Sequence, residues 1–406
     1  MKKELRKLAA LLLAGVLLTG CGIKKQTAEE QEKTDEGSSN QTEEVLEDTD
    51  VMPDSNTSDT EEDTKEKEEE KSEENEKKDQ VEIDLPDEEN LVTDYTSVKG
   101  LILEKGSRLA FVVKGTNTGY WQAVKKGIDQ AIGDLNQELG YNDADKIQYT
   151  FEGPKVEGGV DEQVNILDAV ISENPDVLCL AAVDMDSCEA QLEAARENGI
   201  PVIILDSGVT NNELIDVVCA TDNHSAGAEA AKRLCEIIGD QGEIAVAAHL
   251  QLGESSQERV KGFENEIAEN HPNVTVVAIS YETTKDGEPS IEEQMKETLD
   301  QYPQLKGYFC TNEVMSEKAL TVLKDYADRN IQLVGFDLGK TQAEAIRNGT
   351  EAGVVCQNPY GMGYATVVAA VRAALNMRND EFIDSGYQWL DKTTIDLEEN
   401  AKYLYE

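Results

Sequence analysis

Polar and aromatic side chains directly follow several short apolar runs of the chain, which we interpret as β-strands. The candidate binding residues are Asn117, Thr118, Tyr120, Trp121, Asp184, Asp206, Ser207, Arg259, Asn312, Asp337 and Gln357. Carboxylate and amide groups can form paired hydrogen bonds with adjacent hydroxyl groups, and aromatic faces pack against the C–H faces of a ring. The set therefore predicts a binding site for a small polyhydroxyl molecule such as a sugar.

Each of these residues also has a simpler structural interpretation, because short polar residues after a strand often cap a helix or form a turn. Asp184 is explained as well by a cap as by a ligand contact. Arg259 lies in a predicted helix, where an ion pair with a neighbouring glutamate would also explain it. The Tyr120-Trp121 pair could hold the first helix on the core. We favour the binding hypothesis because the pattern recurs after nearly every strand.

The chain offers little for catalysis or metal binding. It has no Gly-x-Ser-x-Gly segment, Gly-rich phosphate loop or clustered metal-ligand motif, so we expect no enzyme activity, cofactor or metal. His249 ends a predicted strand and could line the site, although a structural role is favoured. Four of the six cysteines after Cys21 lie in predicted buried strands, where a free thiol behaves as a small apolar side chain. The sequence leaves open whether they pair as disulfides.

From residue 107 the chain alternates between apolar runs and helical segments. Most of the runs are uninterrupted, which is typical of strands covered on both faces in a parallel sheet, whereas residues 147–151 alternate. They span residues 109–113, 147–151, 177–183, 201–205, 217–220, 244–248, 274–280, 307–311, 333–336 and 353–356. Two such series predict an α/β fold with two doubly wound, parallel-sheet lobes. Ligands of these sheets bind beyond the carboxyl ends of the strands, where the candidate residues lie.

Residues 1–21 have the pattern of an export signal. Four basic residues precede the apolar run 8–18, which is too short to span a bilayer, and Leu18-Thr19-Gly20 leads to Cys21. The segment resembles a bacterial lipoprotein signal. That resemblance implies that Cys21 carries a diacylglyceryl group, becomes the first residue after cleavage and anchors the protein to the cell membrane. An ordinary secretory signal with a coincidental cysteine is the alternative.

The net charge of −46 is distributed unevenly along the chain. The first 21 residues carry +3, residues 22–100 carry −20 and the remainder carries −29. Residues 22–106 are rich in charged and small polar residues, so we expect a disordered acidic tether there. An acidic body repels phosphate backbones and anionic lipid headgroups, which excludes nucleic acid as a partner and favours a neutral or cationic ligand.

Several motifs resemble the ribose/galactose-type periplasmic binding proteins of sugar transporters. They are Asn-Gly-Ile-Pro-Val-Ile-Ile-Leu-Asp at 198–206, Thr-Asn-Glu-Val-Met at 311–315 and Val-Gly-Phe-Asp at 334–337, with Thr-Asp-Asn at 221–223 and Glu-Arg-Val-Lys-Gly-Phe at 258–263. The resemblance covers about residues 107–395. It implies the type I periplasmic binding protein fold, two Rossmann-like lobes joined by a hinge, which Lac-type repressors share in their ligand domain.

The resemblance also implies which side chains contact a sugar. The family's polar contacts match Asp206, Arg259, Asn312, Asp337 and Gln357, its aromatics match Tyr120 and Trp121, and its asparagine falls on Thr118, next to Asn117. Two positions depart from ribose binders. Ser207 stands where they have an arginine, and a further aromatic near the seventh strand has only Tyr281 or Thr284 as candidates. The expected ligand is therefore a monosaccharide or related small polyol that the sequence does not name.

We expect an N-terminal lobe of residues 107–220, completed by about 358–386, and a C-terminal lobe of residues 221–357, completed by about 387–400. The resemblance implies an extracytoplasmic, monomeric solute-binding lipoprotein that delivers its ligand to an ATP-binding cassette permease. A ligand-sensing lipoprotein that signals to a chemoreceptor or sensor kinase is the alternative. The export signal and the lack of a basic DNA-binding module argue against a repressor.

Overall fold

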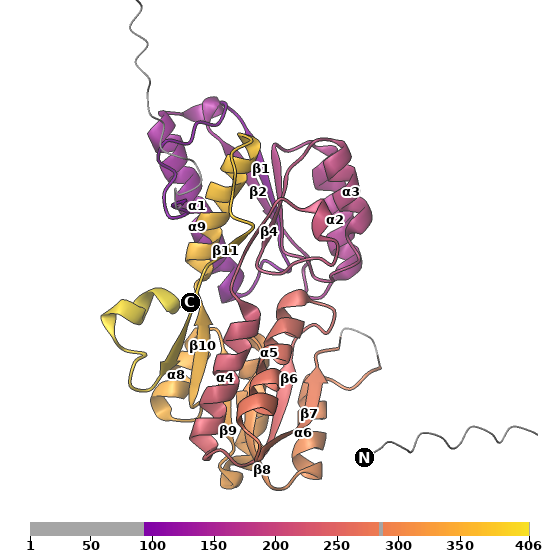
Figure 1. Ribbon diagram of the computed structural model, residues 1–406, viewed down its shortest axis with the longest axis vertical. Coiled ribbons are helices and arrows are strands. Elements are labelled where there is room, and N and C mark those ends of the chain that lie inside the picture. The colour runs from indigo at the N-terminus through magenta and orange to yellow at the C-terminus, as the bar shows by residue number, and fades with distance from the viewer. Residues whose placement is uncertain (1–92, 284–286, 406) are drawn as a thin grey trace, which may run out of the picture. The chain divides into compact units, whose positions relative to one another are not determined.

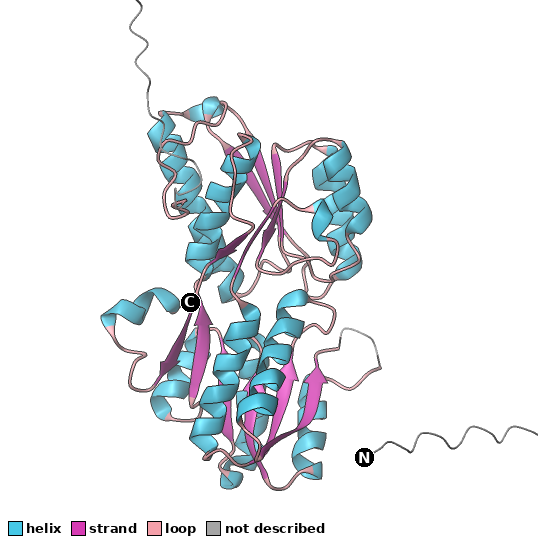
Figure 2. Cartoon of the chain, viewed as in Figure 1, coloured by secondary structure: helices cyan, strands magenta, loops and turns pink. Residues whose placement is uncertain are grey.

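The computed structural model describes residues 93–283 and 287–405, which form two α/β lobes (Figure 1). Each lobe is a sheet with helices packed against it (Figure 2). The predicted signal segment with Cys21, and the predicted tether up to residue 92, lie outside the described residues. Within the described ranges, none of the helices is both long enough and apolar enough to cross a membrane.

The N-terminal lobe contains β1 (Arg108–Val112), β2 (Gln148–Glu152), β3 (Val177–Leu180), β4 (Val202–Leu205), β5 (Val217–Ala220) and β11 (Phe382–Asp384). Its helices are α1 (Gly119–Leu139), α2 (Val160–Ser172), α3 (Glu189–Glu197) and α9 (Pro359–Ala374). Every residue of β3 and β4 is buried, as expected for apolar strands covered on both faces.

The C-terminal lobe contains β6 (Gly242–Ala248), β7 (Val274–Tyr281), β8 (Leu305–Cys310), β9 (Gln332–Phe336), β10 (Gly353–Gln357) and β12 (Tyr387–Asp391). Its helices are α4 (Asn223–Ile238), α5 (Glu254–Asn270), α6 (Ile291–Gln301), α7 (Glu313–Leu323) and α8 (Lys340–Asn348). Short 3₁₀ helices span Asp143–Asp145, Asn212–Leu214, Lys324–Arg329 and Glu398–Tyr403.

The two sheets have matching strand orders. The first is β11-β5-β4-β3-β1-β2 and the second is β12-β10-β9-β8-β6-β7. All neighbouring strands are parallel except β10 and β12, which are antiparallel. The predicted fold of two doubly wound parallel-sheet lobes is therefore confirmed, with one antiparallel edge strand added. In both sheets the strand order reverses beside the first strand, between β1 and β3 or between β6 and β8, which is where such folds bind ligands.

The chain crosses between the lobes three times. It leaves the first sheet after β5 and enters the second lobe through α4, and it returns after β10 through α9, which packs on β3, β4 and β5. The third crossing follows β11, which pairs with β5, and leads to β12, which pairs with β10. Each sheet is thus completed by a segment that is distant in the sequence. The three connecting segments form the hinge about which the lobes can move.

Close contacts between helix backbones position the site-bearing segments. A Cβ atom at Gly227 of α4 would lie 2.1 Å from the Arg259 carbonyl oxygen of α5, and one at Gly262 of α5 would lie 1.9 Å from a carbonyl oxygen of α4. Gly127 and Gly363 allow the same close approach between α1 and α9. Only glycine fits at these positions because any side chain would push the two helices apart.

The folded body begins earlier than predicted. Tyr95, Val98, Leu101 and Leu103 are buried in the core of the N-terminal lobe. The Tyr95 hydroxyl group accepts a hydrogen bond from the Asp380 backbone N–H (2.7 Å). The predicted tether boundary at residue 106 is therefore too late, because apolar residues within a mostly polar stretch pack on the lobe.

All six cysteines of the described part of the chain are free and buried. They are Cys179, Cys188, Cys219, Cys235, Cys310 and Cys356. Burial raises the pKa of several of these thiols, to about 11 at Cys188 and about 12 at Cys219. Buried, protonated thiols of this kind serve as small core side chains.

Candidate functional site

A small cavity of about 30 Å³ is lined by residues from both lobes, most of which follow strands. It is lined by Lys114, Thr118, Tyr120, Trp121, Glu157, Asp206, His249, Arg259, Asn312, Glu313, Val314, Asp337 and Gln357. Eight of the eleven predicted binding residues are among them.

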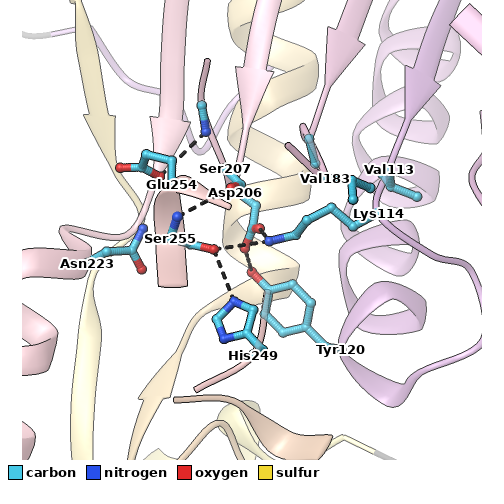
Figure 3. Close-up of polar contacts among 12 residues, drawn as sticks. Val113, Lys114, Tyr120, Val183, Asp206, Ser207, Asn223, His249, Glu254 and Ser255 are labelled. Carbon is cyan, nitrogen blue, oxygen red and sulfur yellow. Dashed lines mark hydrogen bonds and ion pairs between the residues drawn. The ribbon is translucent and has the colours of Figure 1, made fainter. Parts of the chain in front are cut away.

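Asp206 directly follows β4 and is buried at one side of the cavity. Its Oδ1 accepts a hydrogen bond of 2.5 Å from the Tyr120 hydroxyl group, and its Oδ2 lies 2.8 Å from Lys114 Nζ (Figure 3). Burial by itself would raise the pKa of Asp206, but Lys114, Arg259 and the hydrogen bonds hold it below its usual value. Asp206 is therefore an ionised, oriented carboxylate.

Asp337 directly follows β9 and is also buried. Its Oδ1 accepts a hydrogen bond of 2.9 Å from Gln357 Nε2, and its Oδ2 accepts one of 3.3 Å from the Glu313 backbone N–H. Burial raises the pKa of Asp337, although Arg259 and Gln357 oppose the shift. The Tyr120 hydroxyl group lies 3.4 Å from Gln357 Oε1, so this cluster meets the N-terminal lobe directly.

Tyr120 and Trp121 lie in the first turn of α1, whose N-cap is Thr118. The Thr118 hydroxyl oxygen accepts a hydrogen bond from the Trp121 backbone N–H (3.4 Å). The two rings pack edge to face with centroids 5.1 Å apart. Both side chains belong to the lobe core and also line the cavity, so the two sequence interpretations of this pair are compatible.

Arg259 lies in the second turn of α5 and is 2% exposed. Its Nε donates to Asn223 Oδ1 (2.9 Å), its Nη1 donates to the Thr311 carbonyl oxygen (2.7 Å), and its guanidinium lies 3.8 Å from the centre of the Phe336 ring. The alternative of a surface ion pair is wrong, because neighbouring Glu258 pairs with a lysine instead. The contacts use two of the five guanidinium N–H groups, so the others are available to a ligand.

Asn312 has two roles at the start of α7. Its Oδ1 accepts a hydrogen bond from the Met315 backbone N–H (2.9 Å) and caps the helix. The same residue lines the cavity, where its Nδ2 group remains as a donor. The cap fixes the side-chain orientation, so capping and ligand contact are compatible here.

Three predicted residues lie outside the cavity, namely Asn117, Asp184 and Ser207. Asn117 is exposed and donates through Nδ2 to the Lys155 carbonyl oxygen (3.3 Å). Asp184 accepts hydrogen bonds at Oδ1 from the Ser187 backbone N–H (2.9 Å) and hydroxyl group (2.7 Å), so its side chain stabilises a turn. Tyr281, the candidate for the additional aromatic, lines a different cavity, and Thr284 lies outside the described residues.

Ser207 does not line the cavity either, and it links the lobes instead. Its hydroxyl oxygen accepts a hydrogen bond from the Ser255 backbone N–H at the start of α5 (3.3 Å). Lys114 Nζ donates to the Ser255 hydroxyl oxygen (3.1 Å) as well as contacting Asp206 (Figure 3). Ser207 stands where ribose binders have an arginine, so position 207 supplies no positive charge here. Lys114, which follows β1, supplies a cation beside Asp206 instead.

Sequence reasoning missed Lys114, Glu157, Glu313 and Val314 and did not favour His249. Lys114 lies two residues beyond β1, so the strand-end rule that selects Asp206 also selects this residue. His249 has both a structural and a lining position, because its Nδ1 lies 2.7 Å from Thr311 Oγ1. Burial, with Lys114 and Arg259, lowers the pKa of His249 well below its usual value, so this ring is neutral.

In the part of the chain that the structure describes, one group of potential metal ligands lies outside the cavity, where the sequence showed no motif. Ligand atoms of Cys235, Asp240 and His271 lie within 4.8 Å of one another. His271 Nδ1 is 2.9 Å from Asp240 Oδ1, and its Nε2 is 3.4 Å from Glu266 Oε1. Burial raises the pKa of Cys235 to about 12, which favours the thiol over the thiolate that binds metal. The contacts of His271 with Asp240 and Glu266 are sufficient to explain this group.

A family model described as a periplasmic binding protein domain matches residues 109–376, which include every residue that lines the cavity. The chain belongs to the periplasmic binding protein family. The predicted family resemblance is therefore confirmed. Two matched lobes with a cavity at their strand ends are the arrangement that the type I fold of this family predicts.

Relatives within the periplasmic binding protein family include the xylitol-binding protein of Mycolicibacterium smegmatis. It is 25% identical over 235 residues, which are 58% of this chain and 63% of that protein, so the chain covers less than two thirds of that relative. The ribose import binding protein of Escherichia coli is 24% identical over 262 residues, 64% of this chain and 83% of that protein.

A solved member with a similar fold is an ABC transporter solute binding protein from Agrobacterium vitis with bound D-fucose. It is 29% identical, has a TM-score of 0.66 and matches 74% of this chain and 100% of that one. A solute binding protein from Agrobacterium radiobacter in complex with D-arabinose is 23% identical with a TM-score of 0.65 and shows the same fold.

Proposed function

We propose that this protein captures a small sugar or polyol between its two lobes and delivers it to an ATP-binding cassette permease. The observation that carries the proposal is the convergence of Asp206 and Asp337, from opposite lobes, on one cavity. A ligand between these two carboxylates contacts both lobes at once only when the lobes are close together. Ligand binding would therefore stabilise the closed state by hinge motion.

The chemistry of the cavity suits hydroxyl groups. Asp206 and Asp337 accept hydrogen bonds, Arg259 and Asn312 donate them, and Trp121 offers an apolar face. A polyol presents donors and acceptors on adjacent carbons and C–H groups between them, so it can satisfy all three kinds of side chain at once. Nothing in this set is placed for bond cleavage, and we propose binding without catalysis.

The relatives support the same class of ligand. One is named for xylitol, one for ribose import, and the Agrobacterium vitis protein was solved with D-fucose. All three are small polyhydroxyl molecules. The identities of 24–29% do not transfer a particular sugar to this chain, and residues such as Lys114 and Glu313 give its cavity a charge of its own.

We further propose an extracytoplasmic monomer anchored to the cell membrane through lipid on Cys21. The proposal rests on the sequence pattern of residues 1–21 and on membership of a family described as periplasmic. The acidic stretch after Cys21 would hold the binding body away from the membrane surface. Replacement Cys21→Ser should release the protein into the medium, and lipid labelling that persists in this variant would contradict the anchor.

The ligand proposal is tested by thermal unfolding of the full-length protein against pentoses, hexoses, polyols and nucleosides. A ligand present at 100 times its Kd stabilises the folded state by about 2.7 kcal/mol, so one strong stabiliser should stand out. A panel in which no polyol raises the melting temperature would contradict the proposed function. Deletion of the gene that encodes the protein should then abolish cellular uptake of the stabilising compound. Unchanged uptake would contradict a role in transport.

A further inference from the structure

The cavity contains more negative than positive side chains. Four carboxylates line it, from Glu157, Asp206, Glu313 and Asp337, but only two cations, Lys114 and Arg259. His249 is neutral and does not change the balance. Buried charges are normally paired because an unpaired ion loses its hydration without compensation. The lining of the cavity therefore contains two more carboxylates than cations.

The contacts inside the cavity show which carboxylates have a basic neighbour. Lys114 Nζ forms an ion pair with Asp206 Oδ2 at 2.8 Å. Arg259 acts on both Asp206 and Asp337 and lowers the pKa of each. Lys114 also acts on Glu157 and partly offsets the effect of its burial. Each of these three carboxylates thus has a basic neighbour.

Glu313 is the exception. Its Oε2 is buried and has no hydrogen-bond partner among the described residues. The largest effects of charged side chains on its pKa come from Asp337, Glu317 and Glu157, all of them acids. Burial and these neighbours raise its pKa to about 7, against the opposing effect of the Tyr120 backbone N–H. Glu313 and Asp337 thus lie together in the cavity, since the Glu313 backbone N–H donates to Asp337 Oδ2 (3.3 Å).

A neutral hydroxyl group could donate a hydrogen bond to Glu313 but would not neutralise it. A protonated amine supplies three N–H donors and a full positive charge, so it can bond Glu313 and Asp337 together. The remaining groups, Arg259, Asn312 and Trp121, still suit a polyol skeleton. The combination requires a ligand with both features.

We propose that the ligand is an amino sugar or amino polyol whose protonated amine binds beside Glu313 and Asp337. This inference rests on the proposed function, because it assumes that a polyol occupies the cavity, and it adds the charge of that polyol. Two roles of Glu313 then have to be distinguished. Its carboxylate either binds the amine of the ligand or acts as a latch, which means that it holds the lobes together by accepting a hydrogen bond from the Tyr120 backbone N–H at the N-terminus of α1.

The test compares matched pairs of compounds by isothermal titration calorimetry at pH 7.5, using the full-length protein in detergent. The pairs are glucosamine with glucose, galactosamine with galactose, mannosamine with mannose and glucamine with sorbitol. The N-acetyl derivative of each amine is a second control, because it keeps the nitrogen atom but carries no positive charge. At least one amine should bind ten or more times as tightly as its neutral twin and its N-acetyl derivative. Tight binding of a neutral twin without gain from the amine would overturn the inference and leave the proposed function intact.

The variant Glu313→Gln identifies the residue responsible, since it keeps the shape and removes the charge. This variant should bind the amine at least tenfold more weakly than the wild type does, and its affinity for the neutral twin should change less than threefold. Equal weakening of both compounds would show a latch and overturn the amine assignment. Glu344→Gln, on the exposed face of α8, is the matched control and should leave both affinities unchanged. Failure of every compound in all pairs to bind would overturn the proposed function and this inference together.

Discussion

Asp206 and Asp337 occupy equivalent positions in the two lobes. Each is the first residue after the equivalent strand, β4 or β9, and each has the same left-handed backbone conformation, with φ of 71°. The backbone N–H of Asp206 bonds the Cys219 carbonyl oxygen of β5 (3.0 Å), and that of Asp337 bonds the Val355 carbonyl oxygen of β10 (2.8 Å). Left-handed backbone is uncommon outside glycine and is often found at functional sites. Here it turns both carboxylates into one cavity.

The equivalence predicts that Asp337 is essential for ligand binding but dispensable for folding. Asp337→Asn should weaken the ligand found in the thermal screen by about 10- to 100-fold, because hydrogen bonds to a charged acceptor contribute about 1.5–3 kcal/mol. The unliganded variant should be at least as stable as the wild type at pH 7, since a carboxylate whose pKa is raised by burial is removed. Calorimetry and urea unfolding measure the two effects. The exposed Asp325→Asn is the control, and undiminished affinity in Asp337→Asn would refute the assignment.

The Lys114–Asp206 ion pair should be strongly coupled, since both side chains are at least 95% buried. Lys114→Met leaves a buried carboxylate without its cation and should destabilise the fold by about 3–5 kcal/mol. Adding Asp206→Asn should restore most of that loss, because no uncompensated charge then remains. Urea unfolding of the double-mutant cycle gives the coupling. Lys125→Met, which removes an exposed pair with Asp129, should change stability by about 0.5 kcal/mol or less. A similar loss in both single lysine variants would contradict the prediction.

The close approach of α4 and α5 should not tolerate a methyl group. Gly227→Ala places a Cβ against the Arg259 backbone, so we expect about 1–3 kcal/mol of destabilisation and weaker ligand binding as Arg259 shifts. Gly133→Ala is the matched control, because this exposed position in α1 has open space around it. That substitution should stabilise the protein by up to about 1 kcal/mol. Equal stabilities of the two variants in urea would contradict the helix-contact argument.

Glu351 should make the protein less stable as the pH rises. It is 1% exposed, and burial raises its pKa to about 8 from an ordinary value of 4.5, although a hydrogen bond from Gln342 opposes the shift. The folded protein then keeps a proton that the unfolded chain loses. The free energy of unfolding therefore falls as the pH rises through this interval, by about 3 kcal/mol between pH 4.5 and pH 7 from this residue.

Chemical unfolding at several pH values tests this dependence. Glu351→Gln keeps the amide partner and should flatten the curve between pH 4.5 and pH 8. Glu344→Gln, exposed on α8, should retain the wild-type slope. Parallel curves for Glu351→Gln and the wild type would show that Glu351 is ionised in the folded protein.

The positions of the strands and of Asp206 and Asp337 could be predicted from the sequence, because both depend on local pattern. An uninterrupted apolar run defines a buried strand, and the next polar residue lies at its carboxyl end whatever the rest of the fold does. The same reasoning placed Asn117 and Asp184 among the binding residues, and neither of them lines the cavity. Their side chains bond nearby backbone groups instead, and sequence position alone does not distinguish the two outcomes.

The charge balance of the cavity depends on tertiary structure. Lys114, Glu157 and Glu313 follow or begin elements that are far apart in the chain, and only the packing of the two lobes brings them together. Their protonation depends on burial and on one another, neither of which is a local property. The sequence by itself determined two doubly wound lobes and a polar, strand-end site with an acidic surplus in the whole body. The tertiary structure decided that part of this surplus lies inside the cavity, where burial leaves Glu313 Oε2 without a hydrogen-bond partner among the described residues.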